Sequence, residues 1–168
     1  MTGRKPFEPK ALGILLAAVL AGGSGAVAWA QAQKTPYYAS ISAGEARMRA
    51  GPGRNYPVQW LYLRSGLPVK VVMTQPSWRK VEDPDGTQGW MQANLLSEQR
   101  TAIVRDGGIR VLRDQPSPSA QVSWRVEPKV IGRITRCRDG WCRFDVRGRA
   151  GFIEVAQLWG VDASESVE

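Results

Sequence analysis

The chain has 168 residues, of which 23 are Lys or Arg and 15 are Asp or Glu, so its formal charge at pH 7 is +8. Hydrophobic residues make up 43% and charged residues 23%, a balance that excludes both a disordered chain and a multi-span membrane protein. The chain has no histidine and only two cysteines, which excludes histidine-based nucleophile pairs and a four-cysteine metal cage, so we predict no catalytic residue, no metal and no cofactor.

The N-terminal segment has the three parts of a secretory signal. Residues 1–10 carry an excess of cations, residues 11–30 carry no charge, and Ala-x-Ala sequences lie at the end of the uncharged segment. This order predicts a signal peptide over 1–32, cleaved after Ala30 or Ala32, and a periplasmic or secreted protein. The alternative is a retained membrane anchor, because about 20 uncharged residues can just span a bilayer.

An internal repeat occupies the rest of the chain. Trp78 matches Trp141 at an offset of 63 residues, and matches at offsets between 62 and 64 follow in order across the unit. We interpret this self-similarity as two homologous domains. The predicted order is a short linker over 33–37, a first domain over 38–98, a second domain over 101–161 and an acidic tail over 162–168, which we expect to be frayed.

Both domains have the sequence pattern of β-strands. Apolar residues alternate with others at 67–73 and again at 142–146, which is the period of a half-buried strand. Asp85-Gly86 and Asp139-Gly140 are turn signals, and no segment after residue 36 has a helical period longer than two turns. We therefore predict an all-β fold with two small β-barrels in tandem, each of about five short strands, because closure removes exposed sheet edges.

Several motifs resemble those of bacterial SH3-like domains. The segments with this resemblance are 46–52 and 56–58 in the opening half of the first domain, and 78–81, 85–91 and 95–96 in its closing half. The second domain repeats the closing half at 141–153, but its opening at 110–116 lacks the Gly-Pro pair. The resemblance implies two SH3-like barrels that serve as binding modules outside the cytoplasm, often for cell-wall peptides or proteins. Such a fold does not fix a function.

The two cysteines flank a strong hairpin signal. Asp139-Gly140 predicts a two-residue turn in which Arg138 pairs with Trp141, so that Cys137 lies opposite Cys142. A disulfide fits this register and an oxidising compartment. The alternatives are a redox pair, which normally has two intervening residues at a helix start, and a metal site.

Aromatic and basic residues supply the candidate binding site. Tyr56 and Trp60 lie near the predicted first loop, and Arg54 and Arg64 add positive charge there, so we predict that these four residues bind an acidic peptide or polymer. The residues that we assign to the core are Trp78, Trp90, Trp141, Phe144, Phe152, Leu96 and Leu158. Arg47 and Arg110 match in the repeat, and we expect them to hold the first loop through its carbonyl groups or to bind an anionic partner.

The segment 82–86 contains three carboxylates. A glycosidase needs two carboxylates across a cleft and a calcium loop needs six or more oxygens, whereas Asp85-Gly86 indicates an exposed turn. We therefore favour a non-enzymatic extracytoplasmic binding module that recognises a cell-wall peptide or an envelope protein. The alternatives are a cryptic carboxylate-dependent cell-wall hydrolase or its accessory subunit, and a structural envelope protein without a small ligand. The charge also permits weak contact with anionic surfaces, and we expect no nucleic-acid partner.

Overall fold

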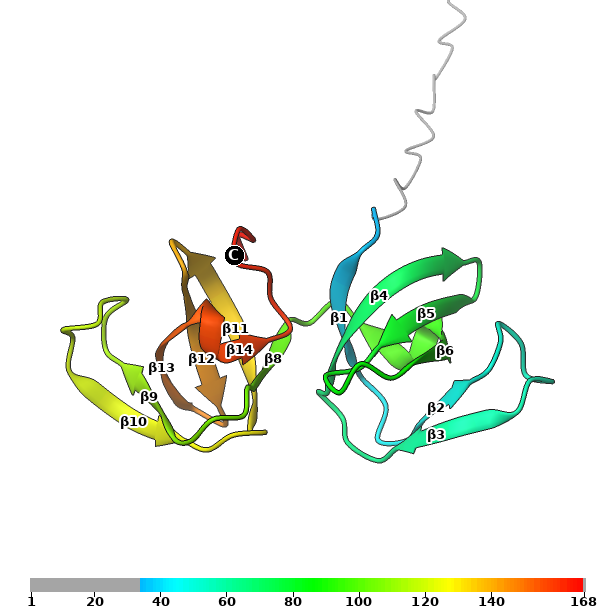
Figure 1. The fold of residues 1–168 in the computed structure, drawn as a ribbon, viewed down its shortest axis with the longest axis horizontal. Coiled ribbons are helices and arrows are strands. Elements are labelled where there is room, and N and C mark those ends of the chain that lie inside the picture. Colours follow the sequence, from blue (N-terminus) through cyan, green and yellow to red (C-terminus); the bar gives the residue numbers. More distant parts are fainter. Residues whose placement is uncertain (1–33, 168) are drawn as a thin grey trace, which may run out of the picture. The chain divides into compact units, whose positions relative to one another are not determined.

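Strands and loops make up nearly all of the computed structural model, which describes residues 34–167 (Figure 1). The predicted signal peptide and the first residue of the predicted linker, Gln33, lie outside the described residues. The strands form two antiparallel sheets of seven strands each, so the predicted all-β fold with two tandem SH3-like domains is confirmed. None of the helical turns within residues 34–167 has the length and apolar character needed to span a membrane.

The first sheet has the strand order β3-β2-β6-β5-β4-β1-β7. Its elements are β1 (Tyr37–Ile41), β2 (Ala46–Arg49), β3 (Val58–Tyr62), β4 (Pro68–Gln75), β5 (Trp78–Glu82), β6 (Gln88–Gln92), the 3-10 turn η1 (Ala93–Leu95) and β7 (Leu96–Ser97). The sheet has seven strands where we predicted about five, and one of the additional strands is the two-residue β7, which pairs with β1.

The second sheet repeats this order as β10-β9-β13-β12-β11-β8-β14. Its elements are β8 (Thr101–Val104), β9 (Arg110–Arg113), β10 (Val122–Val126), β11 (Ile131–Arg138), β12 (Trp141–Val146), β13 (Arg149–Glu154), the 3-10 turn η2 (Val155–Gln157) and β14 (Leu158–Trp159). Each strand of the first sheet thus has a counterpart in the second, which is the topology expected of a duplicated domain.

Each sheet encloses its own hydrophobic core. The fully buried residues of the first core are Ile41, Ala46, Met48, Val69, Val71, Val81 and Met91. Those of the second include Val104, Leu112, Ile134, Cys142, Phe144, Ile153 and Leu158. The first core consists of aliphatic side chains and two methionines, Met48 and Met91, whereas the second contains one buried ring, that of Phe144. Phe144 and Leu158 therefore lie where we placed them.

The assignment of the other aromatic residues to the core needs correction. Trp78, Trp90, Trp141 and Phe152 are only partly buried, and Leu96 packs at the margin of the first core. In β6 and β13 the buried residues are Met91 and Ile153, so the neighbouring aromatic rings point to the other face of the sheet. Successive side chains of a strand alternate between its faces, so a one-residue error reverses the assignment.

Residues 162–167 of the predicted C-terminal tail contact the second domain, and the expectation that the tail is frayed stays a prediction. The amide of Cys137 donates a hydrogen bond to the carbonyl of Val167 at 2.9 Å, and the amide of Val167 donates to the carbonyl of Cys137 at 3.3 Å. Glu165 pairs with Arg100 from the segment that joins the two sheets. The residues after β14 therefore fold back onto the second domain.

Candidate functional site

Strand β3 forms one edge of the first sheet and carries exposed apolar side chains on both of its faces. Among the described strands it pairs with β2 alone, so within this part of the chain its other side presents unpaired backbone groups. Trp60 is 57% exposed, Leu61 is 48% exposed and Leu63, just after the strand, is 71% exposed. Proteins usually protect such an edge with charges, prolines or bulges, because an open apolar edge recruits another strand. We call Tyr56, Val58, Trp60, Leu61 and Leu63 the β3 surface.

An arginine holds the loop that leads into β3. Arg49 donates from Nη1 to the carbonyl oxygens of Arg54 at 3.1 Å and Tyr56 at 2.7 Å. The Tyr56 ring lies against the loop backbone, and a Cβ added at Gly51 would stand 2.4 Å from that ring. A larger residue at position 51 would displace the ring, so this glycine permits the stacking.

The second domain builds the same loop with different residues. Arg113 donates from Nη1 to the carbonyl oxygen of Ala120 at 2.6 Å, as Arg49 does to that of Tyr56. The loop-holding role that we expected of Arg47 and Arg110 therefore belongs to Arg49 and Arg113, and the alternative role, binding an anionic partner, stays a prediction. Arg47 is exposed and pairs with Glu45. Strands β2 and β9 correspond at an offset of 64 rather than 63, so the arginines that match in the structure are Arg49 and Arg113. The match of Trp60 with Trp124, also at 64, is the sequence signal that identifies the correct arginines.

The two edge strands differ in how well they are protected. In the second domain the guanidinium of Arg149 lies over the ring of Trp124 at 5.4 Å from its centroid, an intramolecular cation–π contact. Arg125 stands at the position that corresponds to Leu61. Position 149 corresponds to Thr87 in the first domain, so Trp60 has no equivalent cation and is the more exposed of the two tryptophans. The β3 surface therefore lacks the cation–π contact that Trp124 makes, and it carries Leu61 where the second domain carries Arg125.

The carboxylates of segment 82–86 are engaged separately. Asp83 is 7% exposed, accepts the Tyr62 hydroxyl at 2.8 Å through Oδ2, and accepts the Thr87 amide at 2.8 Å through Oδ1. Burial and then the hydrogen bond to Asp83 raise the pKa of Tyr62 well above its ordinary value. Glu82 accepts a hydrogen bond from Gln88 at 2.7 Å. The segment forms a turn, as predicted, and within residues 34–167 no cluster of three or more metal-binding side chains occurs.

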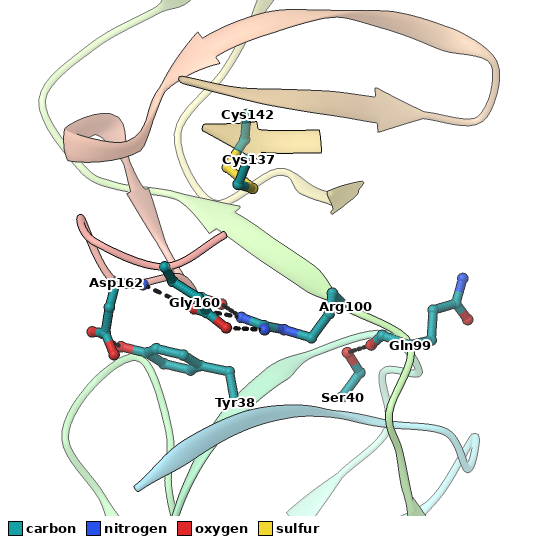
Figure 2. Close-up of polar contacts among 9 residues, drawn as sticks. Tyr38, Ser40, Gln99, Arg100, Cys137, Cys142, Gly160 and Asp162 are labelled. Atoms are coloured by element: carbon teal, nitrogen blue, oxygen red, sulfur yellow. Dashed lines mark hydrogen bonds and ion pairs between the residues drawn. A yellow bond between two sulfur atoms is a disulfide. The ribbon is translucent and has the colours of Figure 1, made fainter. Parts of the chain in front are cut away.

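The described residues 34–167 belong to one compact unit, in which the two domains contact each other at a seam. Tyr38 packs edge-to-face on Trp159 with ring centroids 5.4 Å apart, and the guanidinium of Arg100 lies 5.7 Å from the Tyr38 centroid. Figure 2 shows Arg100 near Gly160 and Tyr38 near Asp162. Arg100 donates to Gly160 at 2.9 Å and to Glu165 at 3.0 Å. Arg100 therefore connects the C-terminal tail to the seam between the two domains.

The seam also shifts the ionisation of its acidic groups. Burial, followed by the negative charge of Asp162, raises the pKa of Tyr38 from 10.0 to about 12. Burial alone would raise the pKa of Glu165, but the hydrogen bond and charge of Arg100 together hold it below its ordinary value. Tyr38 therefore stays neutral and Glu165 stays charged at neutral pH.

Of the four predicted binding residues, three lie around the β3 surface and one lies at the seam. Tyr56 is 42% exposed in the first loop, Arg54 is exposed on the same loop, and Trp60 lies on β3. Arg64 follows β3 and lines a pocket of about 500 Å³ between the two domains. The structure thus places these residues along one continuous segment, 54–64, and their role in binding stays a prediction.

Cys137 and Cys142 form a disulfide, as predicted, with Cα atoms 4.0 Å apart (Figure 2). Arg138 pairs with Trp141, and the turn residues between them have positive φ angles of 51° at Asp139 and 79° at Gly140. That backbone is the type I′ turn that Asp-Gly favours. The bond therefore fastens the β11–β12 hairpin.

Two segments of the chain, residues 42–98 and 107–160, match the family model of the bacterial SH3 domain. Comparison with the curated proteins gives no match. Among solved structures, NlpC1 from Trichomonas vaginalis is similar at 16% identity and a TM-score of 0.33, over 86% of this chain and 50% of its own. NlpC2 from the same organism is similar at 16% identity and a TM-score of 0.34, over 76% of this chain and 49% of its own. An NlpC/P60 family protein from Bacillus cereus is similar at 14% identity and a TM-score of 0.33, over 73% and 55% of the two chains. The chain spans about half the length of these structures.

Proposed function

The chain belongs to the bacterial SH3 domain family, and on that premise we propose that it is an exported, non-enzymatic binding protein whose first domain recognises an extended acidic peptide of the cell wall or of an envelope protein. Domains of this family are generally binding modules. The observation that carries the proposal is the exposed, apolar edge strand β3: Trp60 is 57% exposed, whereas Trp124 at the matching position is 44% exposed and lies under the guanidinium of Arg149.

An extended peptide fits this edge for two reasons. The free backbone groups of β3 can pair with an added strand, and the side chains of Trp60 and Leu61 then contact alternate residues of that strand. The charge beside the β3 surface is positive, since Arg54 and Arg64 are exposed, whereas Arg47 is compensated by Glu45. A peptide with carboxylates therefore complements the site better than a basic one.

Export is part of the proposal. It rests on the signal-like order of residues 1–32 and on the Cys137–Cys142 disulfide, which persists in oxidising compartments. The native protein should begin at Gln31 or Gln33, which N-terminal sequencing determines. A membrane-bound native protein that still begins at Met1 would support the anchor instead.

Co-sedimentation with purified peptidoglycan, and with an envelope protein fraction in parallel, tests the binding surface. Trp60→Ala should reduce binding at least fivefold through loss of an exposed apolar contact, and the domain should stay folded because the side chain is 57% exposed. Trp124→Ala, the matched change on β10 of the second domain, should alter binding less than twofold. Leu61→Glu should act like Trp60→Ala, because it removes an exposed apolar contact and places a negative charge against the acidic peptide.

The outcome assigns the partner class. Trp60-dependent binding to peptidoglycan supports a cell-wall peptide, and Trp60-dependent binding only to a protein in the envelope fraction supports an envelope protein. Equal losses from Trp60→Ala and Trp124→Ala would contradict the β3 surface. Binding to neither preparation would favour a structural envelope protein.

A further inference from the structure

The pocket at the seam has an excess of positive charge. Its volume is about 500 Å³, and its lining includes Arg64 from the first domain and Arg133, Asp145 and Arg147 from the second. Three cations and one carboxylate leave two net positive charges at neutral pH. Within residues 34–167, none of the three arginines forms an ion pair, although Arg133 and Asp145 are neighbours across β11 and β12.

Hydrogen bonds at the seam preform this pocket. Thr101 donates from Oγ1 to the carbonyl oxygen of Gly66 at 2.7 Å, and the amide of Gly66 donates to the carbonyl of Ile41 at 2.7 Å. Arg64 donates from Nη1 to the carbonyl oxygen of Lys129 at 3.4 Å. Both domains thus fix the turn at 64–66. A ligand that enters has little backbone left to order, which lowers the entropic cost of binding.

The guanidinium groups determine which chemistry the pocket accepts. Each presents N–H donors in a planar fork that matches the two oxygens of a carboxylate. Asp145 accepts the amide of Gly148 at 2.7 Å through Oδ1, so part of its hydrogen-bonding capacity is already used within its own hairpin. The arginines remain available for an incoming anion.

We propose that this pocket binds carboxylate groups of the acidic peptide that pairs with β3, an inference that rests on the proposed function. The chain itself connects the two places, because β3 ends at Tyr62 and the next four residues, Leu63–Gly66, line the pocket. A peptide strand paired with β3 is therefore led toward the three arginines. This continuity favours a peptide over a phosphate polymer, which cannot pair with a strand edge.

The experiment is an NMR titration of the ¹⁵N-labelled protein, at fixed ionic strength, with the probes triglutamate and inorganic phosphate. Triglutamate should shift the guanidinium signals of Arg64, Arg133 and Arg147. The double variant Arg133→Gln/Arg147→Gln should weaken triglutamate binding at least tenfold. The control Arg125→Gln/Arg138→Gln removes the same charge from exposed arginines outside the pocket and should weaken binding less than twofold.

Two results would overturn the inference. Equal weakening by both double variants would mean that a diffuse positive field, rather than the pocket, attracts the probe. Tighter binding of phosphate than of triglutamate would assign the pocket to a phosphate ligand. Trp60→Ala separates this inference from the proposed function, because it should leave triglutamate binding to the pocket unchanged even where it abolishes binding to peptidoglycan.

Discussion

Two phenylalanines on one hairpin should differ sharply in their effect on stability. Phe144 is fully buried, and its ring lies so close to the backbone of β11 that a Cβ at Gly132 would stand 2.5 Å from it. A buried aromatic ring covers about 150 Å² or more, which at about 25 cal/mol per Å² corresponds to about 4 kcal/mol. Phe144→Ala should therefore cost about 3–5 kcal/mol, the range for a large-to-small change in a core. Phe152→Ala should cost about 2 kcal/mol or less, because water replaces the ring on the outer face and no internal cavity forms.

Urea unfolding followed through the indole NMR signals measures both domains at once. Trp124 and Trp141 report the second domain, and Trp78 and Trp90 report the first. A loss of about 4 kcal/mol is most of the stability of a small domain, so Phe144→Ala should unfold the second domain at little or no urea while the first stays folded. If Phe152→Ala proves as costly as Phe144→Ala, the assignment of inner and outer faces is reversed.

Two further predictions concern the disulfide and the seam. Denatured, unreduced protein should show no free thiol, and Cys137→Ser/Cys142→Ser should lower the free energy of unfolding by about 2 kcal/mol, the loop-closure value for so short a separation; two reactive thiols in freshly isolated protein would contradict the bond. Because the folded-state pKa of Tyr38 lies near 12 and its ordinary value is 10.0, the unfolded state loses this proton first, and stability should fall as the pH rises from 10.0 toward 12. Tyr38→Phe should flatten that fall in urea midpoints, and an unchanged slope would contradict the shift.

Local signals in the sequence predicted the features that depend on near neighbours. Asp139-Gly140 specifies its turn through backbone angles that few other pairs adopt, so the hairpin and the facing cysteines followed from it. The alternation at 67–73 likewise indicated the buried side of β4, where Val69 and Val71 are fully buried. Such features need no knowledge of the remaining chain.

Features that depend on distant pairing were not predictable in this way. The buried residue in β6 is Met91 rather than Trp90, because the register in which β6 pairs with β5 and β2 decides which of its faces is turned toward the core. The pairing of Val167 with Cys137 likewise depends on the folded β11. The seam pocket takes residues from both domains, so no segment of sequence contains its pattern. Arg64 was predicted as a binding residue, but Arg133 and Arg147 were not.

The paired loops at 50–57 and 114–121 bear on how a duplicated domain diverges. The amide of Ala50 donates to the carbonyl of Pro57 at 3.1 Å, and that of Asp114 donates to the carbonyl of Gln121 at 3.0 Å, so both copies keep one backbone frame. Because an arginine at the end of the preceding strand holds that backbone, the sequence of the intervening residues can change without loss of the loop. One copy can then acquire a new specificity while the other preserves the architecture, and exchanging segments 50–63 and 114–127, which include β3 and β10, should transplant recognition without redesigning either barrel.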